Sequence, residues 1–318
     1  MLEFTNLKLL KLLKISNNIL QEIELSLNED LVKFNFKVDL SLDCKNFYKS
    51  MKKNFFTLLM ISILQQEKID RKRIIKYGKI ILFLGQIVTS VDNMLDKENK
   101  GIISIKGLEN PYVSNSLIML LCEKLLTQTL NELGDKDFLV NKKITNFIYE
   151  IAYGENIRTY ETIEPYMNSN DIIERIHSNI GGKLLELSLL APMTLESDQC
   201  KNKLKEYSAS LFYLGMALQN LDDYYDIKED FNNKKYNLYI AKLLENYKFT
   251  YLYLEEKDIQ SLFYRDLDSI FKNTYYSFKL LKELGYPLEE KDGKKLLKKL
   301  FILRGMKEEH PRVIEYYL

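Results

Sequence analysis

The residues best suited to chemistry are acids at the end of the apolar stretch Leu211–Asp230, LFYLGMALQNLDDYYDIKED. Asp222, Asp226 and Asp230 are spaced four and eight residues apart. At about 100° per residue, steps of four drift only about 40°, so on a helix the three side chains would form one row. Like charges in one row repel, and burial penalises each ionised form. The row therefore predicts a compensating cation.

Oxygen ligands with no His or Cys nearby favour a hard divalent ion, Mg²⁺ before Ca²⁺. Mg²⁺ commonly bridges one or two carboxylates to the phosphates of a substrate. The alternative interpretation is a solvated acidic helix end, whose charges pair with Lys228 and Lys234.

Another acidic segment, earlier in the chain, resembles this one. In chain order we call it the first acidic segment and Leu211–Asp230 the second acidic segment. Ile80–Val91, IILFLGQIVTSV, is apolar on nearly all sides and runs into Asp92 and Asp96, again four residues apart. Two buried helices that end in carboxylates can face each other across one cavity. The sequence thus predicts that five aspartates from distant parts of the chain meet around shared metal ions.

Composition bounds the class of protein. No Pro/Gly/Ser-rich linker interrupts the 318 residues, so we expect one domain, 1–318, in which 1–44 form an N-terminal helix and linker. A hydrophobic content of 46% and a charged content of 29% are ordinary for a globular protein with a sizeable core. The net charge of +1 gives no reason to expect nucleic acid as a partner. No apolar run approaches the roughly 20 residues of a transmembrane segment, so none is expected.

Cysteine and histidine usage excludes other kinds of site. Cys44, Cys122 and Cys200 are isolated, which argues against a thiolate zinc site and fits a cytoplasmic location. With only His177 and His310, a site built on several histidines is not expected.

Apolar residues recur at helical spacing along most of the chain, which indicates an all-α protein. The exception is Phe34–Leu42, which alternates with period two and is interpreted as an extended linker or minor hairpin. The helices are predicted at Leu2–Leu27, Lys45–Gln66, Arg71–Leu95, Tyr112–Leu133, Asp137–Arg158, Ser169–Leu190, Asp198–Asp230, Lys235–Asn246, Asp258–Leu284 and Asp292–Leu303. Gly181-Gly182 predicts a kink, a close approach to a ligand, or close helix packing.

The two acidic segments resemble the paired aspartate-rich motifs of the trans-isoprenyl diphosphate synthases, the polyprenyl synthetase family. Gln219 to Asp226 fits that family's QxxDDxxD, and the pattern continues through Lys235. Asp92 to Asp96 matches DDxxD except that Asn93 replaces the second acid. The likeness extends from about Ser50 to Leu243.

This resemblance implies a single-domain bundle of antiparallel helices around a central apolar cavity, the isoprenoid synthase fold, and a homodimer. It implies more than one Mg²⁺ ion, which would hold the diphosphate of an allylic prenyl substrate of C10–C20 or longer. Apolar and aromatic walls would shield the carbocation, because ring faces stabilise cations. Candidates for this lining are Phe83, Phe212, Tyr213, Tyr149 and Tyr153, with core packing as the alternative for each ring. The implied metal ligands are the aspartates Asp92, Asp96, Asp222, Asp226 and Asp230.

Departures from the family pattern concern the second diphosphate, which chain-elongating members bind through basic residues at three places. Here the first place keeps Lys52 and Lys53 but has no GGKR glycines, and the second is a shortened Asn99-Lys100-Gly101. The third has no Lys-Thr, although Lys183 follows one turn later. Arg supplies a planar bidentate fork for phosphate that Lys lacks, so a weak second site is inferred.

Two subclasses of the same fold do not need that second site. In terpene synthases the cation cyclises or is quenched, and the spacing of Asp222, Asp226 and Asp230 resembles their second metal triad. Arg175 lies where such enzymes often keep a diphosphate-sensing arginine, although an ion pair with Asp171 or Glu174 is equally open. The ComQ-type peptide prenyltransferases, which modify a small peptide, are the other subclass.

The leading hypothesis is a Mg²⁺-dependent isoprenoid synthase that ionises an allylic diphosphate, with an acceptor that is not a diphosphate. Its predicted diphosphate contacts are basic residues from both halves of the chain, Arg175, Lys183, Lys235, Lys52, Lys53 and Lys100. The alternatives are a chain-elongating polyprenyl diphosphate synthase and a non-catalytic subunit of a heteromeric synthase. The sequence does not give the substrate's chain length.

Overall fold

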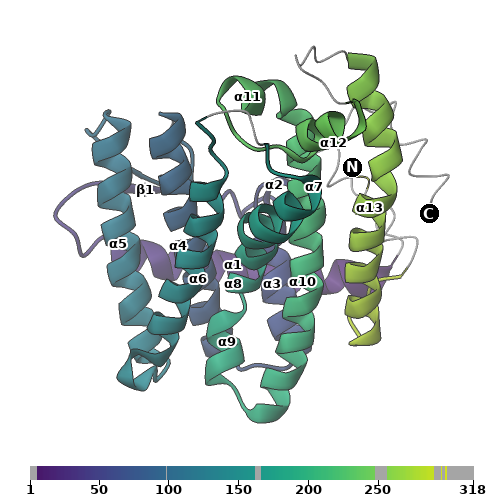
Figure 1. The fold of residues 1–318 in the computed structure, drawn as a ribbon. Coiled ribbons are helices and arrows are strands. Elements are labelled where there is room, and N and C mark those ends of the chain that lie inside the picture. The colour runs from purple at the N-terminus through teal and green to yellow at the C-terminus, as the bar shows by residue number, and fades with distance from the viewer. Residues whose placement is uncertain are drawn as a thin grey trace. The chain divides into compact units, whose positions relative to one another are not determined.

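The structure is a computed structural model that describes residues 6–97, 99–161, 166–247 and 256–289, with Lys295 and Lys298. Within these residues nearly all regular structure is helical, which confirms the predicted all-α class (Figure 1). The chain divides into two compact units, one formed by 1–143 and 188–204 and the other by 144–187 and 205–318. The predicted single domain stays a prediction.

The first unit is built on α4 (Arg71–Asp96), which matches its predicted bounds to within a residue. The Asp70 side chain begins this helix by accepting bonds from the Lys72 and Arg73 amides at 2.9 and 3.4 Å. α4 packs against α1 (Leu7–Leu31), α3 (Phe55–Gln66), α5 (Pro111–Glu132) and the short α9 (Leu190–Leu195). Asn110 caps α5 and Pro111 begins it, one residue before the predicted start at Tyr112.

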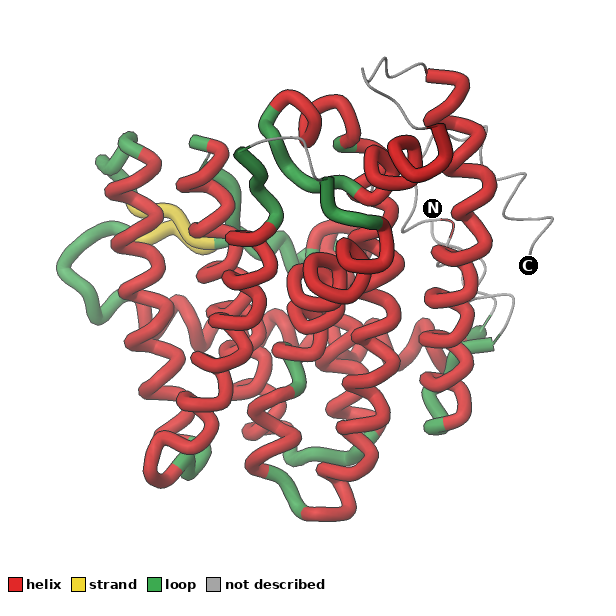
Figure 2. The backbone as a smooth tube through the Cα atoms, in the orientation of Figure 1, coloured by secondary structure: helices red, strands yellow, loops and turns green. Residues whose placement is uncertain are grey.

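Two predictions in this unit are corrected. The predicted helix Lys45–Gln66 is divided into α2 (Phe47–Lys53) and α3, because the buried Asn54 leaves helical geometry and donates from Nδ2 to the Leu42 carbonyl at 2.5 Å. The period-two stretch forms no hairpin, and its strand β1 (Val38–Leu40) pairs antiparallel with β2 (Ile103–Ile105), Val38 opposite Ile105 (Figure 2). The three residues of β2 are too few to show periodicity.

α4 is also the one helix among the described residues that is long and apolar enough, by length and composition, to cross a membrane. Of its most apolar window, 61% is buried inside the protein. The core helix of a soluble protein passes the same test, so this is weak support for a span.

The second unit contains most of α6 (Leu139–Ile157) and of α10 (Asp198–Tyr225), together with α13 (Glu256–Glu283). Short helices follow one another before and after α10, namely α7 (Ser169–Asp171), η2 (Ile172–Lys183), α8 (Leu184–Leu187), α11 (Ile227–Asn232) and α12 (Leu238–Tyr247). Ile172, Ile176 and Ile180 of η2 form a buried cluster with Leu238 and Ala241 of α12. This cluster fixes the start of α12 against η2.

The predicted helix Ser169–Leu190 is irregular, because η2 has π-helical hydrogen bonding over twelve residues. A Cβ at Gly181 would lie 2.6 Å from the Gly215 carbonyl oxygen, and a Cβ at Gly182 would overlap the Phe212 ring. Of the three interpretations of the Gly pair, close packing of η2 against α10 is therefore the one observed. Pro192 does not end the preceding helix and instead lies in the first turn of α9, where no amide donor is needed.

The predicted helix Asp198–Asp230 is also corrected. α10 ends at Tyr225, the chain bends at Asp226, and α11 follows. Two further predictions, the break at Glu164-Pro165 and the helix Asp292–Leu303, lie outside the described residues except for Lys295 and Lys298, which are helical.

Candidate active site

The three aspartates of the second acidic segment do not share one environment, because the bend at Asp226 interrupts the expected row. Asp222 near the end of α10 is half-buried, Asp226 at the bend is exposed, and Asp230 on α11 is only 3% exposed. The predicted row thus becomes two accessible carboxylates and one buried carboxylate.

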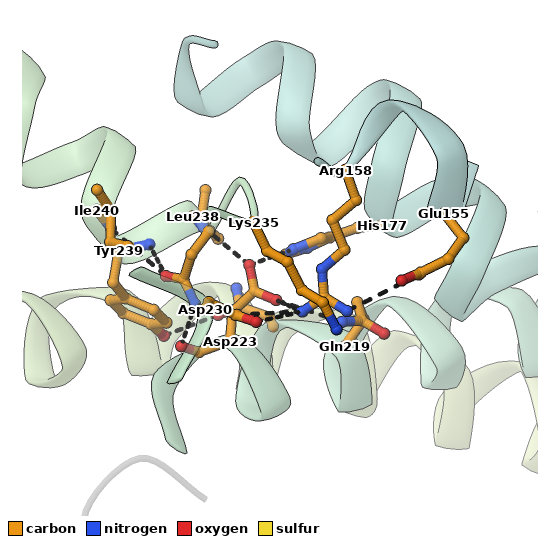
Figure 3. Close-up of polar contacts among 12 residues, drawn as sticks. Glu155, Arg158, His177, Gln219, Asp223, Asp230, Lys235, Leu238, Tyr239 and Ile240 are labelled. Atoms are coloured by element: carbon orange, nitrogen blue, oxygen red, sulfur yellow. Dashed lines mark hydrogen bonds and ion pairs between the residues drawn. The ribbon is translucent and has the colours of Figure 1, made fainter. Parts of the chain in front are cut away.

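The buried carboxylate is paired with Arg158, which follows α6. Arg158 Nη2 donates to the two oxygens of Asp230 at 3.1 and 3.3 Å, and lies 3.7 Å from an oxygen of Asp223 (Figure 3). Nη1 of the same guanidinium lies 3.9 Å from Glu155. The acidic row predicted a compensating cation of unspecified kind. For Asp230 that cation is Arg158.

His177 of η2 completes the surroundings of Asp223, which is 1% exposed. One Asp223 oxygen lies 2.9 Å from His177 Nε2 and accepts from the Leu238 amide at 2.8 Å, while the other accepts from Gln219 Nε2 at 3.2 Å. Burial by itself raises the pKa of Asp223, but attraction to His177, its hydrogen bond and Arg158 together hold that pKa below the usual range.

Asn237 joins the two buried acids, and its own side chain is fully buried. Its Nδ2 donates to the Asp223 carbonyl at 2.6 Å and to Asp230 Oδ2 at 2.8 Å, while its Oδ1 accepts from the Tyr239 amide at 2.9 Å at the start of α12. We call Arg158, His177, Asp223, Asp230 and Asn237 the Arg158 cluster. It ties α6, η2, α10, α11 and α12 together at one point.

Loss of solvent also shifts the pKa values of Asp230 and Asp226. It raises the pKa of Asp230 to about 6, against the opposing attraction of Arg158, so this carboxyl remains ionised at neutral pH. Burial and the charge of Glu229 also raise the pKa of Asp226. A cation near Asp226 would relieve that unfavourable charge.

Lys235, one of the predicted diphosphate contacts in this unit, lies beside the Arg158 cluster (Figure 3). Its amide donates to the Asp230 carbonyl at 2.8 Å, and it forms an isolated antiparallel bridge with Thr159. Lys183 is paired with Glu150 at 2.8 Å. Arg175 is exposed on η2 and, within the described residues, makes no ion pair with Asp171 or Glu174.

In the first unit, Asp92 is exposed near the end of α4. Asp96 is the last residue of that helix, and only its backbone is described. Lys52 is exposed, whereas Lys53 is held at 2.8 Å by both Ser41 and Asp43. Lys100 is exposed, and its main chain is bonded to Asn93. That the two acidic segments meet around shared ions stays a prediction.

Asn93, which stands where the family pattern has an acid, is a structural residue. It is 2% exposed, donates from Nδ2 to the Lys100 carbonyl at 2.6 Å and to Asn115 Oδ1 at 3.0 Å, and accepts from the Lys100 amide at 3.0 Å. Gln86 holds the same loop by accepting from the Ile102 amide at 2.8 Å. The shortened loop after α4 is therefore bound back to the helix.

Restoring the acid with Asn93→Asp is expected to destabilise the protein by about 1–3 kcal/mol, because a carboxylate cannot donate to the two oxygens that Asn93 contacts. Urea unfolding measures the loss. The control is Asn18→Asp, the same change at an exposed position of α1, for which we expect no more than about 0.5 kcal/mol. Equal stability of the two variants would contradict this role for Asn93.

The aromatic residues predicted to line a cavity have different surroundings. Phe83 is buried in the core, whereas Tyr149 and Tyr153 stack at 6.5 Å on an exposed face of α6. Phe212 lies against Gly182 and meets Tyr213 edge to face. Sequence reasoning missed Arg158, His177 and Asn237 as partners of the buried acids Asp223 and Asp230. The signal available was the rarity of histidine, because His177 is one of only two in the chain.

The donor chemistry of the accessible aspartates fits Mg²⁺. Asp222 and Asp226 offer carboxylate oxygens from adjacent turns, and Mg²⁺ needs only one or two protein carboxylates when phosphates supply the rest. Within the part of the chain that the structure describes, no three His, Cys, Asp or Glu side chains are grouped as a complete metal site.

Of the comparisons with known proteins, the one with solved structures bears on the fold. No protein-family model matches this sequence, and no curated protein matches it. Among solved structures, it is similar to the heptaprenyl diphosphate synthase from Staphylococcus aureus, with 16% identity, a TM-score of 0.54, and coverage of 92% of this chain and 98% of that chain. It is also similar to a decaprenyl diphosphate synthase from Rhodobacter capsulatus (15%, 0.54, 84% and 86%) and a geranylgeranyl pyrophosphate synthetase from the archaeon Geoglobus acetivorans (16%, 0.52, 82% and 88%). The predicted fold is thereby confirmed: the chain has the all-α fold of the trans-isoprenyl diphosphate synthases.

Proposed function

We propose that the protein is a Mg²⁺-dependent isoprenoid synthase that ionises an allylic prenyl diphosphate and releases diphosphate. The observation that carries this proposal is the pair of accessible carboxylates, Asp222 and Asp226, at the bend between α10 and α11. The carbocation is cyclised, quenched or passed to an acceptor that is not a diphosphate. The fold shared with three prenyl diphosphate synthases supports the general class.

Each group of residues has a separate task in this proposal. Asp92, Asp96, Asp222 and Asp226 would hold Mg²⁺, which supplies Lewis-acid stabilisation of the leaving diphosphate when bound. Arg175, exposed on η2, and Lys235, beside the Arg158 cluster, would donate to phosphate oxygens. Apolar walls would exclude water from the cation, which would otherwise be hydrolysed.

The basic residues favour an acceptor other than a second diphosphate. Lys53 is engaged by Asp43, and Lys183 by Glu150. At the place of the family's Lys-Thr, Asn179 donates to the Arg175 carbonyl at 2.8 Å and Ile180 belongs to the apolar cluster. Neither of these two residues offers a cation to a second diphosphate.

Chain elongation is the second candidate, because the similar solved structures are named as synthases of long prenyl diphosphates. Lys52 and Lys100 are exposed, and lysine binds phosphate as a point charge. A homodimeric state and a cytoplasmic location stay predictions.

The test is to incubate the purified protein with Mg²⁺ and labelled C10, C15 or C20 allylic diphosphates, with and without isopentenyl diphosphate. Diphosphate release and mass spectrometry of the products are measured. We expect release without isopentenyl diphosphate and a product that carries no diphosphate. A longer diphosphate formed only with isopentenyl diphosphate would establish elongation instead, and no release under either condition would reject the proposal.

A further inference from the structure

Asp230 of the second acidic segment is held by donors of the protein itself. Its side chain is 4% exposed, both its oxygens accept from Arg158 Nη2, and Oδ2 also accepts from Asn237 at 2.8 Å. A carboxylate has about four acceptor positions, and three are used here. Among the residues that the structure describes, no comparable set of donors holds Asp226.

Asp223 is held by the same guanidinium. Its oxygens contact His177, the Leu238 amide and Gln219, and one oxygen lies 3.7 Å from Arg158 Nη2. Arg158 is itself only 12% exposed, and its Nε has no hydrogen-bond partner within the described residues. Arg158 is thus a buried cation shared by two buried carboxylates, one of which also contacts His177.

Metal binding by Asp230 would compete with this arrangement. Mg²⁺ requires near-octahedral geometry with oxygens at about 2.0–2.1 Å, so the carboxylate would have to turn away from Arg158 and Asn237. Both donors would then remain buried without their acceptor, which is costly for an amide and more so for a charged group. The protein donors therefore have the advantage at Asp230.

Asp226 differs from Asp230 in both respects. Its side chain is exposed, and within the described part of the chain it forms no ion pair. Asp222 lies one helical turn before Asp226 and is half-buried. The Asp226 amide donates to the Asp222 carbonyl at 2.9 Å, so helical hydrogen bonding joins the two residues. An ion can reach these two carboxylates without breaking the Arg158 cluster.

We propose that Arg158 is a built-in counter-ion of the second acidic segment: by holding Asp230 and Asp223, it leaves Asp222 and Asp226 as that segment's magnesium ligands. Arg158 is thus a positioning residue. It fixes which of the evenly spaced acids are presented to the ion. This inference rests on the proposed function, and it removes Asp230 from the ligand set that the spacing alone predicts.

The experiment titrates the full-length protein with Mn²⁺ as a spin-active substitute for Mg²⁺ and measures the free ion by electron paramagnetic resonance. The variants are Asp230→Asn and Asp226→Asn, with Glu229→Gln as the control, an exposed acid on the same short helix. We expect Asp226→Asn to weaken binding about tenfold or more, whereas Asp230→Asn and Glu229→Gln stay within about twofold of the parent. If Asp230 only supports the structure, Asp230→Asn lowers the free energy of unfolding. The Mn²⁺ affinity of the folded variant then equals that of the parent.

Loss of affinity in Asp230→Asn equal to that in Asp226→Asn would overturn the inference and leave the proposed function standing. Unchanged affinity in Asp226→Asn would instead reject the proposed metal site, and this inference with it. If Asp230→Asn lowers the yield of folded protein, its folded fraction is isolated by size-exclusion chromatography and compared with the parent in the same titration.

Discussion

Replacing Asp226 with asparagine is expected to lower Mg²⁺-dependent diphosphate release about 10²–10³-fold, the range found when one preorganised stabiliser of developing charge is removed. The reason is that Asp226 is the exposed carboxylate of the second acidic segment, at the bend between α10 and α11. Asparagine keeps the size of the side chain and removes its charge. The measurement is the rate of diphosphate release from the allylic substrate that the product analysis identifies.

Glu229→Gln is the matched control for Asp226→Asn. Glu229 is exposed three residues further on, and its charge contributes to the raised pKa of Asp226, so both changes remove one negative charge from the same region. We expect Glu229→Gln to retain the parent rate within about twofold, because it is not among the proposed ligands. Equal losses in the two variants would show that general charge near α11 matters and that a specific ligand does not.

Replacing Arg158 with methionine is expected to lower the free energy of unfolding by about 3–5 kcal/mol, because it leaves Asp223 and Asp230 buried without their shared cation. The loss should be measured by urea unfolding followed by circular dichroism. Arg175→Met makes the same change at an exposed position of η2 and is expected to cost no more than about 0.5 kcal/mol. A loss below about 1 kcal/mol for Arg158→Met would contradict the central place of Arg158 in this unit.

The double variant Arg158→Met/Asp230→Asn separates loss of the ion pair from loss of packing. Removing Asp230's charge eliminates one of the two uncompensated carboxylates, so we expect the double variant to be more stable than Arg158→Met alone by about 0.5–3 kcal/mol, the range of coupling between contacting residues. The loss of unfolding free energy caused by Asp230→Asn alone is the reference. If Asp230→Asn causes the same loss in the Arg158→Met background, the two residues act independently and the ion pair contributes nothing.

The competition between the two candidate functions depends on charges that the structure shows to be already engaged. Lys53 and Lys183 each contact an acid within their own unit, and Asn93 binds the loop that carries Lys100 back to α4. A second diphosphate would have to displace these acids or bind beside them. Under the proposed function, the engaged Lys53 and Lys183 favour ionisation of a single diphosphate over elongation.

The sequence by itself determined the helical class, the bounds of α4 and α5 to within a residue or two, and both acidic segments. These features depend on local physics, namely apolar spacing, the Asp70 and Asn110 caps, and the position of Pro111. Asn54 and Asp226 interrupt helices that apolar spacing predicts as continuous. Spacing does not detect such a bend, because the apolar pattern continues on both sides of it.

Only the tertiary structure decided which acids are accessible. Arg158 and Asp230 are 72 residues apart, and Asp223 and His177 are 46 apart, so no local pattern could pair them. The partner of β1 was missed for the same reason, since β2 lies more than sixty residues later. Spacing made Asp222, Asp226 and Asp230 equivalent, whereas burial beside a single guanidinium made them different. Long-range packing chooses the partner of each charge, and that choice is absent from any one segment.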